Sequence, residues 1–241
     1  MRKTLMTSCL TLSCAVFAYA DFTHNLICRW TFNSKDAATA LTDDVSGLKL
    51  SQTGTGKAQT LEFKDGCAVL GAGTLLFAPE INSDNPKFKS LGEQLTIWIR
   101  MKPEGKPQGF FAGLLDAHKP ADWNQLIFTS HITDKGQLRL FGTNKEIKRF
   151  STAAVPEKFK NQEFNNIVIQ LNTKTKTYRM IVNGAATVEH KNNNAGDLMS
   201  FKSFALGRLK EHEGMDMNID EVRLYSSYVA PEWLEEIEPV K

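Results

Sequence analysis

The strongest constraint on the fold is a two-residue alternation of side-chain types in short segments of the chain. It is clearest over Leu95–Pro103, where the odd positions carry Leu, Ile, Ile, Met and Pro, and the even positions carry Thr, Trp, Arg and Lys. Side chains of a β-strand point alternately to its two faces, so one face of this segment belongs to a hydrophobic core. The opposite face is predicted to be amphipathic or exposed.

Further short segments are separated by clusters of Gly, Asn, Asp and Lys. The predicted strands are Leu26–Phe32, Leu61–Phe63, Cys67–Leu70, Leu75–Phe77, Gly109–Leu115, Gln125–His131, Leu138–Phe141, Asn166–Leu171, Tyr178–Val182, Ser203–Arg208 and Gly214–Tyr225. Turns are predicted at 172–176 and at 183–184, an Asn-Gly pair. The one predicted helix begins near Pro231, with acidic residues in its first turn. Many short strands with turn signals between them are typical of an all-β sandwich.

The first twenty residues have the features of an export signal. Arg2 and Lys3 precede an apolar run, and Ala-Tyr-Ala at 18–20 is a small-x-small cleavage site. A lipoprotein signal at Cys14 is the alternative, but an apolar stretch follows this cysteine. We expect cleavage after residue 20 and one domain over residues 21–241, exported to the periplasm, the cell surface or the extracellular space.

Charge gives no argument for a polyanionic partner. Two of the 29 basic residues and none of the 27 acidic residues lie in the signal, which leaves a balanced domain. A balanced charge does not attract nucleic acid or anionic membrane over long range. No stretch reaches the roughly 20 apolar residues of a membrane span. We therefore expect a soluble domain without a nucleic-acid partner or a membrane span.

Two cysteines, Cys28 and Cys67, remain after the signal is removed. An exported protein meets oxidising conditions, so a disulfide between them is expected. The alternative is two separate buried thiols, because free cysteine behaves as a small hydrophobic residue. Two cysteines without histidines at ligand spacing do not predict a zinc site.

Several segments together resemble the LamG-like domains of the concanavalin A-like lectin/glucanase superfamily. They are Trp30–Phe32 with Asp43–Gly47, Leu95–Pro103, Asn165–Gln170 with Val182–Gly184, and the closing segments Ser203–Arg208, Gly214–Tyr225 and Ala230–Ile237. They follow the family's order and spacing over nearly all of residues 21–241. The resemblance implies a two-sheet antiparallel jelly roll with a short C-terminal helix. It also implies glycan binding, with or without hydrolysis.

Two positions depart from the family pattern. Arg100 stands where the family usually has Trp, which replaces an apolar anchor with a cation. Phe164 and Asn165 stand where a Trp-His pair is common, at a position that belongs to the scaffold.

Catalytic motifs are missing from the sequence. Retaining hydrolases of this superfamily place carboxylates along one strand as E-x-D-x-x-E, so that two of them meet in a cleft at about 5 Å. The nearest segment here is Asp216–Glu221, where Asp216, Asn218 and Asp220 share a face. Its match to the closing scaffold strand favours a structural role. A lyase site built from His118, His131 and Arg100 is a weaker alternative, so we expect a non-catalytic protein.

A structural calcium ion is expected from three carboxylates. Calcium prefers carboxylate and carbonyl oxygens of loops. Asp43 and Asp44 lie in the opening loop, and Asp220 lies in the closing strand, which the family topology places near the first strand. Asp220 is the preferred ligand. The alternative is that all three are ordinary turn and strand residues.

Aromatic platforms and planar hydrogen-bonding groups are the features expected of a glycan site. Trp123 lies in a polar stretch that is predicted to be a loop, with Asp122, Asn124 and His118 nearby as polar partners. The alternative for Trp123 is an anchor packed on the edge of the sandwich.

Trp98 and Arg100 share the non-core face of their strand and form a second candidate surface. A guanidinium can clamp a carboxylate or sulfate, so an acidic glycan or glycoprotein is a candidate partner. The alternatives are ordinary packing for Trp98 and a cross-strand ion pair for Arg100. The leading hypothesis is a carbohydrate-binding or adhesion-type domain; a glycan-degrading enzyme with an atypical site and a protein-interaction domain are the others.

Overall fold

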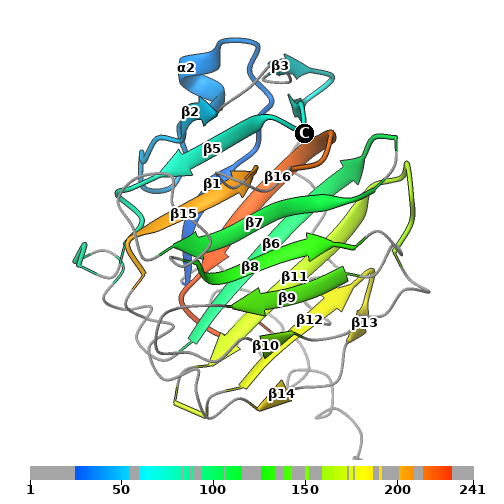
Figure 1. Ribbon diagram of the computed structural model, residues 1–241. Helices are drawn as coiled ribbons and strands as arrows, with labels where there is room; N and C mark the ends of the chain where they lie inside the picture. Colours follow the sequence, from blue (N-terminus) through cyan, green and yellow to red (C-terminus); the bar gives the residue numbers. More distant parts are fainter. Residues whose placement is uncertain are drawn as a thin grey trace, which may run out of the picture.

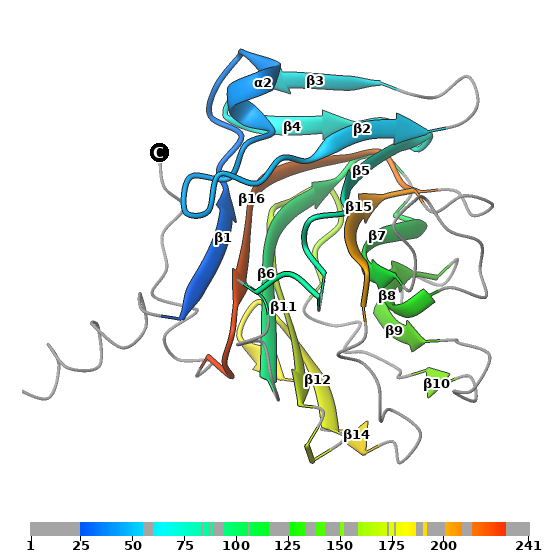
Figure 2. The same ribbon diagram turned by 90° about the vertical axis from the view of Figure 1, so that its left-hand side faces the viewer.

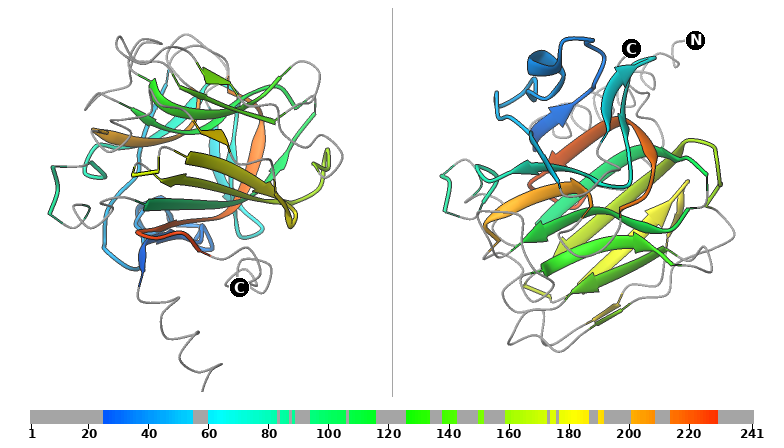
Figure 3. Two further views of the ribbon diagram at one scale, coloured as in Figure 1. Left: turned by 90° about the horizontal axis from the view of Figure 1, so that it is seen from below. Right: turned by 45° about the horizontal axis from the view of Figure 1, so that its top comes forward.

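Two antiparallel β-sheets face each other and enclose a hydrophobic core (Figure 1). The computed structural model describes residues 25–54, 60–82, 84–86, 88, 94–105, 107–115, 126–133, 138–142, 150–151, 159–172, 174–175, 177–186, 190–191, 201–208 and 214–229. The two sheets form separate layers in the side view and in the view from below (Figures 2 and 3). This arrangement confirms the predicted all-β jelly-roll sandwich.

The larger sheet has nine strands in the described part of the chain. They are β1 (Leu26–Trp30), β3 (Leu61–Lys64), β4 (Cys67–Leu70), β6 (Gln94–Pro103), β11 (Asn165–Asn172), β12 (Thr177–Val182), β13 (Ala185–Ala186), β14 (His190–Lys191) and β16 (Met217–Tyr225). The order is β13-β12-β11-β6-β16-β4-β3, with β1 paired to β16 and β14 paired to β12.

The smaller sheet has seven strands among the described residues, in the order β10-β9-β8-β7-β15-β5-β2. They are β2 (Ser51–Gly54), β5 (Thr74–Ala78), β7 (Gly109–Leu115), β8 (Leu126–Ile132), β9 (Leu138–Gly142), β10 (Phe150–Ser151) and β15 (Ser203–Gly207). In Figure 1, β7, β8 and β9 lie in front of the larger sheet.

Alternating side chains of β6 build the core as the sequence predicts. Leu95, Ile97, Ile99 and Met101 are each at most 1 % exposed and belong to the cluster between the sheets. Trp30 of β1 stacks on Phe204 of β15, with ring centroids 6.1 Å apart, and so joins the two layers. Burial of apolar area at roughly 25 cal/mol per Å² makes this cluster the main source of stability.

A second apolar layer covers part of the outer face of the nine-stranded sheet. Residues 226–229 cross this face after β16, and Val229 packs there with Trp98 and Tyr225. Polar side chains of the sheet hold the crossing segment. The amide nitrogen Nε2 of Gln170 donates to the Val229 carbonyl at 2.6 Å, and the Thr96 hydroxyl donates to the Ser227 carbonyl at 2.6 Å. We call residues 226–229 the strap.

Two β-hairpins have the same kind of two-residue turn, of which the sequence predicts one. Asn183 and Gly184 have φ values of 48° and 78° between β12 and β13, as the predicted Asn-Gly turn requires. Asp65 and Gly66, with φ values of 54° and 78°, form the same kind of two-residue connection between β3 and β4. Both central residues have positive φ, which is the property of a type I′ turn.

The short helix α2 (Ala37–Ala40) was not predicted. Its N-cap is Asp36, whose carboxylate accepts a hydrogen bond from the Thr39 backbone nitrogen at 2.8 Å. Four residues are too few to produce a helical hydrophobic period, so only the cap signals this helix. The predicted helix near Pro231 lies outside the described residues, as does the predicted export signal. In the described part of the chain, no helix is long and apolar enough to cross a membrane.

The predicted disulfide is not formed, because Cys28 and Cys67 are both free, buried thiols. Cys28 lies opposite Leu224 of β16, whereas Cys67 precedes Ala68, which lies opposite Ile219 of the same strand. β1 and β4 thus lie end to end along one edge of β16. This places the two cysteines roughly 13 Å apart along the strand direction, beyond the ~7 Å limit between Cα atoms of a disulfide.

The loop after β1 is organised by one buried carboxylate. Asp43 is 2 % exposed. Its Oδ1 accepts hydrogen bonds from the backbone nitrogens of Val45 and Ser46, and its Oδ2 accepts from the Ser46 hydroxyl and the Leu48 nitrogen, all at 2.6–3.0 Å. The neighbouring Asp44 is exposed and pairs with Arg29 at 2.8 Å.

These two aspartates make a matched pair for a stability measurement. Asp43→Ala leaves buried backbone N–H groups without partners, so it should lower the free energy of unfolding by about 3 kcal/mol. Asp44→Ala removes an exposed ion pair and should cost less than about 1 kcal/mol. Urea unfolding of both variants checks this, and equal losses would contradict the assigned role of Asp43.

Candidate functional site

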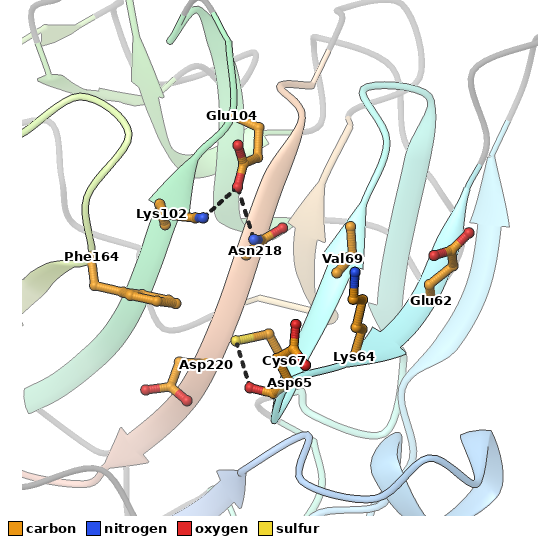
Figure 4. Close-up of a pocket in the computed structure, with 10 residues that line it drawn as sticks. All are labelled: Glu62, Lys64, Asp65, Cys67, Val69, Lys102, Glu104, Phe164, Asn218 and Asp220. Atoms are coloured by element: carbon orange, nitrogen blue, oxygen red, sulfur yellow. Dashed lines mark hydrogen bonds and ion pairs between the residues drawn. The ribbon is translucent and has the colours of Figure 1, made fainter.

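A groove of about 520 Å³ opens on the outer face of the nine-stranded sheet (Figure 4). Its described lining residues come from β3, β4 and the turn between them, from β6 and β16, and from the segments that follow β6 and precede β11. They are Glu62, Lys64, Asp65, Cys67, Val69, Lys102, Glu104, Phe164, Asn218 and Asp220. One aromatic ring, one amide and several charged side chains therefore surround an open space.

A β-bulge in β16 creates one wall of the groove. Ile219 lies opposite Met101 of β6, and Glu221 lies opposite Arg100, so Asp220 is the extra residue of the bulge. A bulge shifts the alternation of side chains by one position. Ile219 and Val222 consequently both face the core, while Asp220 and Glu221 both lie on the outer side.

Asp220 pairs with the guanidinium of Arg100 across the bulge. The Nε atom of Arg100 donates to Asp220 Oδ2 at 2.7 Å, and both side chains are about a quarter exposed, at 27 % and 21 %. The guanidinium carbon also lies 5.0 Å from the centroid of the Phe164 ring, within the range of a cation–π contact. Arg100 therefore has the cross-strand ion pair that was the alternative to a ligand clamp.

A second ion pair, between Lys102 and Glu104, also lies near the Phe164 ring. Lys102 Nζ is 2.7 Å from Glu104 Oε1, and the same oxygen accepts a hydrogen bond from Asn218 Nδ2 at 2.9 Å. Lys102 Nζ is 5.9 Å from the Phe164 centroid. Figure 4 shows Phe164 on the side of Lys102 and Asp220, with Glu62 and Lys64 on the opposite side.

The structure corrects the predicted stacking role of Trp98. Its side chain is 0 % exposed, and it packs in the outer apolar layer with Val168 and Ile181. The Arg223 guanidinium lies 4.9 Å from the Trp98 ring centroid, and Arg223 itself pairs with buried Glu221. A ring enclosed in this way cannot stack on a sugar, so the alternative of ordinary packing holds for Trp98.

The other predicted ligand-binding residues, Trp123, Asp122, Asn124 and His118, lie outside the described residues. The strand β8 includes His131, but the description does not extend to this side chain. The loop site and the lyase arrangement therefore stay predictions.

The three predicted calcium ligands do not converge. Asp43 accepts four hydrogen bonds inside its own loop, Asp44 pairs with Arg29, and Asp220 pairs with Arg100. In the described ranges, no group of three or more His, Cys, Asp or Glu side chains could hold a metal ion. Calcium remains a prediction from the sequence.

The carboxylates of the enzyme hypothesis are also engaged in structural contacts. Asp216 Oδ1 accepts a hydrogen bond from the backbone nitrogen of Ala72 at 2.7 Å. Asp220 and Glu221 each pair with an arginine. Of these three, only Asp220 lines the groove in the described structure.

Most lining residues were not proposed as site residues from the sequence, among them Phe164, Glu104 and the charged side chains of β3 and its turn. The alternation in β6 and the shared face of Asn218 and Asp220 were readable signals for part of the groove. Phe164 precedes β11 and Glu104 follows β6, so their proximity depends on the order of strands in the sheet. No local pattern carries that information.

The Cys67 thiol in the groove offers a chemical test of the environment. Burial, and secondarily the Asp220 carboxylate, raises the pKa of Cys67 to about 11. The thiolate is the reactive form, so alkylation of the folded protein should be slow at pH 8 and rise about tenfold per pH unit toward the pKa. Iodoacetamide labelling with peptide mapping measures this rate, with urea-unfolded protein as the control. A plateau of the folded-state rate below pH 9 would contradict the raised pKa.

Solved structures show the same fold at low sequence identity. Domain 4 of AbnA, a GH43 extracellular arabinanase from Geobacillus stearothermophilus in complex with arabinotriose, has a TM-score of 0.59 at 16 % identity, over 88 % of this chain and 97 % of that chain. A structure of botulinum neurotoxin type C, whose cell entry depends on interaction with two ganglioside molecules, has a TM-score of 0.62 at 14 % identity. NanB with Optactamide has a TM-score of 0.53 at 20 % identity.

The extent of these matches differs. This chain is covered to 90 % by the neurotoxin and to 65 % by NanB, but it spans only 51 % and 26 % of those two chains. A comparison of the sequence with curated proteins gives no match. A family model described as the concanavalin A-like lectin/glucanases superfamily matches residues 80–234. Because this match covers well over half of the sequence, the protein belongs to the concanavalin A-like lectin/glucanases superfamily.

Proposed function

We propose that the protein is an exported, non-catalytic domain that binds a glycan in the groove of the nine-stranded sheet. The observation that carries this proposal is the composition of the groove, in which Phe164 and Asn218 lie among carboxylates and lysines. Sugar rings pack their C–H faces on aromatic rings, and their hydroxyls require charged or amide partners. The groove supplies both kinds of contact.

The similar structures support the same class of ligand. One of them contains arabinotriose, and another belongs to a toxin that depends on gangliosides. Identities of 14–16 % show a shared fold and do not transfer a site. The groove of this chain must therefore account for binding through its own side chains.

A non-catalytic role is supported by the contacts of the acidic side chains. A glycosidase needs two carboxyl groups placed on either side of the scissile bond, one with a raised pKa. Asp216 is tied to the Ala72 backbone, and Asp220 is paired with Arg100. Both carboxylates are thus engaged in structural contacts.

A protein-interaction domain without a sugar ligand is the second candidate. The burial of Trp98 favours it, because one of the two aromatic residues proposed for stacking is part of the scaffold. Export to the periplasm, the cell surface or the extracellular space is proposed from residues 1–20 alone.

Substitution of Phe164 tests the groove directly. Phe164→Leu retains an apolar side chain but removes the flat ring, so glycan affinity should fall at least about tenfold, while the thermal midpoint stays nearly constant. Val45→Ala is the matched control, since Val45 is an apolar residue that is 46 % exposed and lies away from the groove. A glycan array followed by calorimetry on the best ligand gives the affinities.

Trp123→Ala should be measured in parallel, because Trp123 is the competing platform predicted from the sequence. Loss of binding in Trp123→Ala with full binding in Phe164→Leu would move the site from the groove to the 118–125 segment. Absence of binding to every glycan on the array would reject the proposed function and favour the protein-interaction domain.

A further inference from the structure

The groove is acidic in its described lining. The carboxylates of Glu62, Asp65, Glu104 and Asp220 outnumber the two lysines, Lys64 and Lys102. We propose that the groove selects an uncharged sugar and rejects glycans that carry carboxylate or sulfate groups. This inference rests on the proposed glycan-binding function and specifies its ligand class.

The two cations that β6 places at the groove are engaged with neighbouring carboxylates, and the third, Lys64, is flanked in sequence by Glu62 and Asp65. Lys102 lies 2.7 Å from Glu104, and Arg100, beside the groove, lies 2.7 Å from Asp220. These side chains are only partly exposed, between 21 % and 42 %, so their ion pairs are less screened than fully exposed pairs. An anionic ligand must compete with Glu104 or Asp220 for a cation of β6, and it is repelled by the other carboxylates of the groove. The acidic-sugar preference expected from Arg100 is reversed by this pairing.

An uncharged sugar meets no such repulsion. Its hydroxyl groups act as donors, and carboxylate and amide oxygens are the acceptors that the groove offers in excess. Asn218 lines the groove and donates from Nδ2 to Glu104 at 2.9 Å, which holds that carboxylate in place as an acceptor on the wall of the groove.

A pair of oligosaccharides that differ only in one carboxylate or sulfate group provides the test. With the full-length protein at 50 mM NaCl, the neutral member should bind at least about tenfold more tightly, and 500 mM NaCl should change its affinity by less than about twofold. Tighter binding of the charged member, weakened by salt, would overturn the inference but keep the proposed function. Failure of both members, and of every other glycan tested, would remove the proposed function as well.

A charge-neutralising variant links the selectivity to the groove. In Glu62→Gln/Asp65→Asn both side chains keep their shape, and Asn accepts the positive φ of 54° at position 65. Affinity for the charged oligosaccharide should rise at least about threefold, while affinity for the neutral one stays the same. The control is Glu80→Gln/Asp84→Asn, two exposed acids that do not line the groove. Equal effects of the two double variants, or none in either, would overturn the groove as the origin of selectivity.

Discussion

The bulge at Asp220 is the constraint on which the outer face of the larger sheet depends. β16 is central, with β6 along one edge and β4 and β1 along the other. Ile219 and Val222 can both reach the core only if one extra residue stands between the two halves of the strand. The same shift places Asp220 and Glu221 side by side on the outer face. Asp220 then pairs with Arg100, and Glu221 pairs with Arg223. The first ion pair is partly exposed, whereas the second is almost fully buried.

One half of the outer face is closed and the other half is open. In the closed half, Glu221 and Arg223 are almost fully buried beside Trp98, in the layer to which Val229 of the strap belongs. Removing two charges from water is expensive, and the pairing and the aromatic contact offset part of that cost. In the open half, the Arg100–Asp220 pair remains partly hydrated beside Phe164. The two arginines that pair with the bulge residues thus lie on different sides of this boundary. Arg223 belongs to the buried scaffold, and Arg100 lies beside the candidate site.

Local patterns predicted the longer strands but not the short strands β2, β10, β13 and β14. Other errors arose from pairing between segments that are distant in sequence. The alternation in β6 gave its core face correctly, but Thr96 and Trp98 on the opposite face are buried as well. The spacing of apolar residues in β16, with Ile219 followed by Val222, already contains the shifted phase of the bulge, and this signal was missed. The disulfide failed because the order of strands places β1 and β4 end to end. The burial of Trp98 and the position of Phe164 depend on segments that are distant in sequence.

The groove also explains how one scaffold can serve different ligands. The core-facing positions of β6 and β16 are fixed by packing between the two sheets, so changes there are costly. The outer positions 102, 218 and 220 face the groove from the same two strands, and their side chains do not pack between the sheets. Similar folds at 13–20 % identity are therefore compatible with different surfaces at these positions. The chain pairs each groove cation on β6 with a neighbouring carboxylate, so the selectivity we propose depends on the carboxylates that lack such a cation. That arrangement follows from the order of strands in the sheet and not from any single motif.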